Sequence, residues 1–177
     1  MDALSEYLDL INYLPFLIAT FALIHNWSNI GARWLLILSL TVACLEEYTQ
    51  TYAIHWTTHY YAWAIFFNFL YIFPILFRKK IAQEIFNRTG NKFFYEATKL
   101  KFSPQEAAIM LLCLISVVGH AISYVEVFLY KSFLIDVMYF KNYILAKLQL
   151  ILHILATLAI LSLSFRFKGL NYAATKA

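Results

Sequence analysis

The chain has 177 residues, of which 62% are hydrophobic and 19% aromatic, whereas only 14% are charged, with a formal net charge of +4. A soluble domain has about 25% charged residues, which it needs to cover its core with a polar surface. The composition therefore excludes a soluble domain and predicts one all-α membrane domain over residues 1–177. The sequence has neither a Gly-rich phosphate loop nor a nucleophile elbow, so nucleotide chemistry is not expected. Because so little of the chain lies outside the predicted spans, we do not expect an enzyme.

Five stretches of mainly apolar residues are each long enough to cross the membrane as a helix, which takes about 20 residues. We expect these spans at residues 8–25, 34–54, 59–77, 105–127 and 144–166. The start of the chain is acidic, unlike a signal peptide, so the first stretch is expected to remain as a membrane helix. The sequence Ser103-Pro-Gln-Glu106 predicts a capping box at the start of the fourth span.

The basic residues predict the orientation of these spans. Seven of the fourteen lie between the third and fourth spans, and three more lie at the end of the fifth span or beyond it. Because cytoplasmic loops are enriched in Lys and Arg, we expect both regions and the C-terminus in the cytoplasm and the N-terminus outside. Such a polytopic bundle is expected in a bacterial inner (cytoplasmic) membrane. Residues 128–143 are interpreted as an outer interfacial segment, where a count of four or six spans stays open.

Residues 79–103 form the one sizeable polar segment, a basic amphipathic loop expected in the cytoplasm. Apolar residues recur at helical spacing on both sides of Asn87-Arg-Thr-Gly90, which predicts two short helices lying on the inner leaflet. Cations on such helices attract anionic lipid or a partner protein, whereas nucleic acid is not expected. The candidate lipid-binding or partner-binding residues are Arg78, Lys79, Lys80, Lys92, Lys99 and Lys101.

Several polar residues of the predicted spans fall at one depth, in the outer half of the bilayer. Ionisable groups cost about 2.5 to 3.5 kcal/mol at the centre of a membrane helix, so they normally face the bundle interior and find partners. We therefore expect a carboxylate of the layer to contact a histidine. The layer either fixes the register of the helices or binds a cation, a proton or a polar ligand. Its predicted members are Glu46, Glu47, Gln50, His120, His153 and Asn12.

No resident cofactor is expected, and a metal site and a haem site are the two alternatives. His55 and His59 have the i, i+4 spacing of metal ligands if this segment is helical. His120 and His153 lie at equal depth on consecutive helices, with Gly119 leaving room beside one of them, which would suit a b-type haem.

The sequence thus predicts an accessory, sensing or ion- and ligand-binding membrane component that works as a homo-oligomer or with a partner protein. A haem-dependent electron-transfer subunit is one alternative. A membrane effector or immunity-type protein that acts on bilayer integrity is another.

Overall fold

The computed structural model describes residues 15–174, with side chains described as far as residue 163. Within these residues the chain is 84% helical and has no strand, which confirms the predicted all-α class. The helices in chain order are Pro15–His25, α2 (Ile30–Ala53), α3 (Tyr60–Leu76), α4 (Arg78–Thr89), α5 (Lys92–Lys99), α6 (Pro104–Lys131), the π-helix η1 (Phe140–Leu145) and α7 (Ala146–Ala174).

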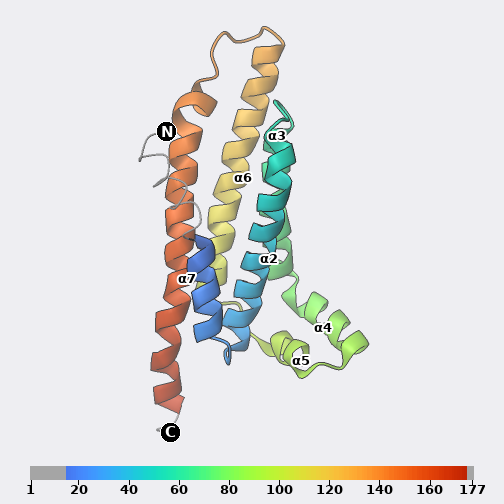
Figure 1. The fold of residues 1–177 in the computed structure, drawn as a ribbon, viewed down its shortest axis with the longest axis vertical. Helices are drawn as coiled ribbons and strands as arrows, with labels where there is room; N and C mark the ends of the chain where they lie inside the picture. Colours follow the sequence, from blue (N-terminus) through green and yellow to red (C-terminus); the bar gives the residue numbers. More distant parts are fainter. Residues whose placement is uncertain (1–14, 175–177) are drawn as a thin grey trace.

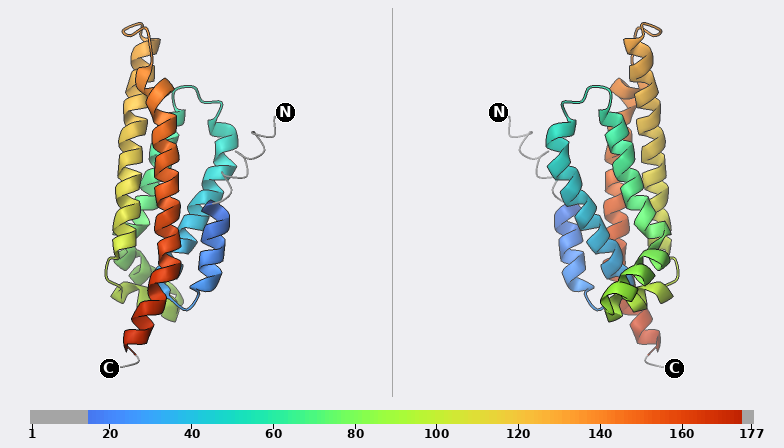
Figure 2. Two further views of the ribbon diagram at one scale, coloured as in Figure 1. Left: turned by 90° about the vertical axis from the view of Figure 1, so that its left-hand side faces the viewer. Right: turned by 90° about the vertical axis from the view of Figure 1, so that its right-hand side faces the viewer.

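The long helices α2, α3, α6 and α7 run along the bundle with alternating direction (Figure 1). In both side views α2 and α6 lie on opposite sides of the bundle, with α3 and α7 between them (Figure 2). The short helices α4 and α5 lie across one end of the bundle, and the connection from α6 to α7 lies at the other (Figure 1). We call these the α4–α5 end and the opposite end.

Two helical segments, Pro104–Lys131 and Phe140–Leu163, are long and apolar enough to cross a membrane, and a third is added if α3 and α4 count as one span. That pair is bent by 72°. The helix Pro15–His25 is apolar but short, and the rest of the first predicted span, residues 8–14, lies outside the described residues. Helix α2 is long enough, but it carries Arg33, Glu46 and Glu47.

The helix ends follow local sequence signals. The Ser103 side chain accepts a hydrogen bond from Glu106 N, and the Glu106 carboxylate accepts one from Ser103 N, so the predicted capping box is present. Gly90 ends α4 in the left-handed conformation, with φ of 64°, which a residue without Cβ adopts at little cost. The predicted separation of two short helices at this glycine is therefore confirmed.

The apolar faces of α4 and α5 pack in part against α2, and their predicted position in the lipid headgroups stays a prediction. Ala82 of α4 and Ala97 of α5 are fully buried and form one cluster with Trp34 of α2. Phe93 and Phe94 of α5 both contact the Trp34 ring, with centroids 6.3 Å away. These short helices thus pack on the N-terminal part of α2, because their small alanines let Trp34 approach closely.

The segment predicted to be interfacial, residues 128–143, begins inside α6. This helix continues to Lys131, and a turn then leads into η1. The Glu126 carboxylate accepts hydrogen bonds from Phe140 N at 2.8 Å and Lys141 N at 2.7 Å, which satisfies the free amides where η1 begins. Phe133, in the turn, is 95% exposed.

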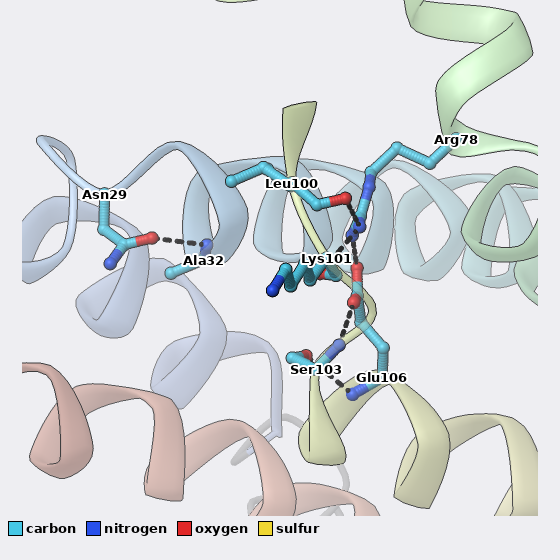
Figure 3. A network of polar contacts seen from close by, with 7 residues as sticks. All are labelled: Asn29, Ala32, Arg78, Leu100, Lys101, Ser103 and Glu106. Atoms are coloured by element: carbon cyan, nitrogen blue, oxygen red, sulfur yellow. Dashed lines mark hydrogen bonds and ion pairs between the residues drawn. The ribbon is translucent and has the colours of Figure 1, made fainter. Parts of the chain in front are cut away.

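A buried ion pair between Arg78 and Glu106 joins the segments that meet at the α4–α5 end (Figure 3). The two side chains are 5% and 3% exposed. Arg78 also donates to the carbonyl oxygens of Leu100, at 3.2 Å, and Lys101, at 3.0 Å. Burial lowers the pKa of the Arg78 guanidinium, and the adjacent carboxylate opposes this by favouring the charged form. The pair fixes the bend between α3 and α4 against the start of α6.

We expect Glu106→Gln to lower the free energy of unfolding in detergent by about 3 to 5 kcal/mol, because it leaves the buried Arg78 without its counter-charge. The matched control is Glu84→Gln, which removes the exposed pair Arg88–Glu84 and should change stability by about 0.5 kcal/mol or less. Equal effects of the two substitutions would show that the buried pair does not stabilise the junction of α3, α4 and α6.

Candidate functional site in the α3–α6–α7 core

The residues predicted to form one polar layer do not meet in one place. Glu46 is half-buried on α2, whereas Glu47 and Gln50 of the same helix are exposed. His120 of α6 is buried, at 7% exposure, and His153 of α7 is exposed. Asn12 lies outside the described residues.

The predicted contact between a glutamate of α2 and a histidine is not found. Among the described residues the ion pairs are Arg78–Glu106 and Arg88–Glu84, and neither involves the layer. The reason is visible in Figure 2, where α2 and α6 lie on opposite sides of the bundle. The glutamates of α2 and His120 of α6 are therefore separated around the bundle, although their helical positions correspond to a similar depth.

A polar core nevertheless exists where α3, α6 and α7 meet. Ser116 of α6 donates a hydrogen bond to Gln149 Oε1 of α7 at 3.2 Å. His120 and Ser123 lie further along the same buried face of α6, and the His120 ring is 6.2 Å from that of Tyr61 on α3. We call Tyr61, Ser116, His120, Ser123 and Gln149 the polar core.

Three atoms of the polar core have unused hydrogen-bonding capacity. His120 Nδ1, Ser123 Oγ and Gln149 Nε2 are buried and have no hydrogen-bond partner in the described part of the chain. Leaving a buried polar group unsatisfied costs about 1 to 3 kcal/mol, so such groups are normally paired. The core can therefore supply both donors and acceptors to a small guest.

The residues do not fit the haem alternative. A Cβ on Gly119 would lie 2.9 Å from Leu148 Cδ2, so this glycine allows α6 and α7 to touch and leaves no room for a macrocycle. His153 is exposed, and its Nδ1 lies 3.0 Å from the Gln149 carbonyl oxygen of its own helix. The two histidines are thus not arranged as two axial ligands around a common space.

The His55 and His59 alternative also fails, because the two residues lie in the turn between α2 and α3 and not on a helix. The His59 Nδ1 instead lies 3.5 Å from the Tyr124 hydroxyl. Lys131 donates to the hydroxyls of Thr57 and Thr58 and so ties this turn to the end of α6. Within residues 15–174 no group of three or more side chains could hold a metal ion.

Five of the six cations predicted to bind lipid or a partner are exposed around the α4–α5 end. The exception is Arg78, which is 4% exposed and engaged with Glu106, so its charge is not available at the surface. Lys99 Nζ lies 4.0 Å from the centroid of the Tyr95 ring. The exposed cations are Lys79, Lys80, Lys92, Lys99 and Lys101.

Sequence reasoning missed Tyr61, Ser116 and Ser123 as members of a site. The signal was present, because positions 116, 120 and 123 follow one face of a helix at i, i+4 and i+7. Comparisons with models of protein families, with curated proteins and with solved structures found no match.

We expect Glu47→Gln and His153→Gln to act additively on stability in detergent, within about 0.5 kcal/mol, because the two groups are not in contact. The matched pair is Ser116→Ala with Gln149→Leu, where the direct hydrogen bond predicts a coupling of about 0.5 kcal/mol or more. Strong coupling of Glu47 with His153 would instead show that this glutamate and this histidine are in contact.

Proposed function

We propose that the chain crosses a bacterial inner membrane with five helical segments, its N-terminus outside and its α4–α5 end in the cytoplasm. The exposed lysines of α4, α5 and the connection to α6 support this orientation, because Lys and Arg are enriched on the cytoplasmic side. The alternating direction of α2, α3, α6 and α7 is compatible with successive crossings (Figure 1).

Cysteine labelling tests this topology in a Cys44→Ala/Cys113→Ala background. A membrane-impermeant thiol reagent added to intact cells should modify Asp136→Cys, at the opposite end, and spare Asn87→Cys, in α4; both positions are exposed. After the cells are opened, both variants should react. The reverse pattern in intact cells would mean that the α4–α5 end faces outward.

We further propose that the protein is a sensing or accessory component, not an enzyme, that binds a small hydrogen-bonding guest in the polar core. The observation that carries this proposal is the presence of three buried polar atoms without partners on two adjacent helices. Buried polar groups in membrane helices commonly mark the sites of ions, protons or ligands.

The chemistry of the three groups favours water, or a proton that water carries, as this guest. Gln149 Nε2 only donates, Ser123 Oγ donates and accepts, and His120 Nδ1 does either according to its tautomer. A guest that both donates and accepts satisfies all three. A metal cation would find few ligands here, since no carboxylate is among the five residues of the polar core.

Apolar clusters border the polar core on both sides. Toward the α4–α5 end the interior is filled by a cluster that includes Leu35, Leu36, Ile75, Ile109 and Ile160, and toward the opposite end Val127 and Leu145 pack with Tyr61. Clusters of this kind exclude water and oppose passage through the whole bundle. The proposed role is therefore binding or sensing and not conduction across the membrane.

A second copy of the chain or a partner protein is proposed to cover the polar groups that the single chain leaves exposed. Glu47 on α2 and His153 on α7 are exposed at depths where the five-segment arrangement places lipid. Ionisable side chains are costly in that position, so association that shields them is favoured.

The sign of the change in unfolding free energy on removing a polar group tests whether water is bound in the polar core. Ser123→Ala should lower the free energy of unfolding by about 1 kcal/mol, because it removes a hydrogen bond to bound water. Were Ser123 Oγ truly unpaired, the same change would be neutral or stabilising. The control is Ser162→Ala, since Ser162 bonds to the Ala159 carbonyl of its own helix. NMR should also show a cross-peak between water and the His120 ring, and its absence together with a stabilised Ser123→Ala variant would refute the proposal.

A further inference from the structure

A pocket of about 560 Å³ lies beside the Arg78–Glu106 pair at the α4–α5 end. Its wall is formed by the first turn of α2, the connection from α5 to α6, the first turn of α6 and Leu163 of α7. Many of the lining side chains are apolar, among them Leu35, Leu100 and Phe102. The volume lies within the range of about 300 to 1,000 Å³ that is usual for ligand sites. The pocket therefore suits a ligand with a hydrocarbon part.

Several polar groups of this pocket remain free, and most of them can donate hydrogen bonds. Gln105 is 8% exposed, and its side-chain amide makes no hydrogen bond within the described part of the chain. Arg78 Nε is buried and likewise has no partner among the described residues, although both Nη atoms are engaged. The Lys101 side chain runs from the α5–α6 connection toward the first turn of α2 (Figure 3). A ligand here would be met by an amide, a guanidinium and an ammonium group.

The charge of the pocket favours an anion. Arg78 and Lys101 contribute two positive charges and Glu106 one negative charge, which leaves a net charge of +1. Both oxygens of the Glu106 carboxylate are already used, one by Arg78 and the other by Ser103 N. A cationic group on a ligand would therefore find no free carboxylate in the described lining.

The starts of α2 and α6 converge on the same pocket. Asn29 and Ser103 cap these helices by accepting from Ala32 N and Glu106 N, so each uses one amide of the first turn. Other first-turn amides point out of the helix start and favour negative charge there. This effect adds to the buried Gln105 and Arg78 groups, which are the independent sign of a ligand.

We propose that this pocket binds the headgroup phosphate of an anionic phospholipid from the leaflet at the α4–α5 end. The phosphate would accept hydrogen bonds from Gln105 and Lys101, the buried Arg78 guanidinium would add positive charge beside it, and an acyl chain would follow the apolar wall past Leu35 and Leu163. A zwitterionic lipid is disfavoured, because its ammonium group would lie among donors. The site is separate from the polar core, and it differs from general attraction to the surface lysines because it requires one shaped pocket.

The test is lipid retention by the full chain in detergent, measured by native mass spectrometry. We expect one phosphatidylglycerol molecule to bind at least about tenfold more tightly than phosphatidylcholine, and Gln105→Leu to weaken it by about tenfold through loss of a donor. Because the Gln105 amide has no protein partner to lose, this variant should keep its thermal stability. Gly31→Leu should have a similar effect on binding by filling the pocket.

Two control variants test whether the loss of lipid binding is specific to this pocket. A Cβ on Gly31 would make ordinary contacts of 3.6 and 3.7 Å, so Gly31→Ala should bind lipid like the parent chain. Lys92→Gln removes an exposed cation outside the pocket lining and should also leave retention unchanged. Equal retention of the two lipids, or phosphatidylglycerol binding that survives both Gln105→Leu and Gly31→Leu, would overturn the proposal. Equal thermal protection by inorganic phosphate alone would overturn the assignment to a lipid.

Discussion

The Arg78–Glu106 pair is the interaction on which the arrangement of the α4–α5 end depends. Arg78 follows the last residues of α3, and Glu106 lies in the first turn of α6, so the pair joins segments 28 residues apart in the chain. Glu106 has two roles, because one carboxylate oxygen holds Arg78 and the other caps Ser103 N. A single side chain thus determines both where α6 begins and where the chain turns away from α3.

The positions of the helices could be predicted from local signals, because these act within a few residues. The capping box at Ser103 and the left-handed Gly90 are of this kind, and both are present. The burial of Arg78 could not be predicted in this way. In the sequence it is the first of three consecutive cations, and only the tertiary structure shows that it turns inward while Lys79 and Lys80 remain exposed.

The predicted polar layer shows a different limit of sequence reasoning. Counting residues along a helix gives the depth of Glu47 or His153, but a contact also requires that two helices be neighbours and that their faces point toward each other. Helix α3 packs against both α2 and α6, so the glutamates and His120 lie on different sides of the bundle. Ser116 and Ser123 share a face with His120, which spacing alone could have shown.

The length of α6 has a consequence for how the protein fits its membrane. Its 28 residues span about 42 Å at 1.5 Å per residue, whereas a hydrocarbon core is about 30 Å thick. A tilt of about 20°, the average for membrane helices, still leaves nearly 10 Å of helix beyond the hydrocarbon. Polar side chains occupy both ends of α6: Gln105 and Glu106 lie in its first turn, and Glu126 and Lys131 lie in its last turns, where they bind η1 and the α2–α3 turn. In a bilayer of that thickness, the excess length would place such polar turns beyond the hydrocarbon, where water and lipid headgroups can contact them.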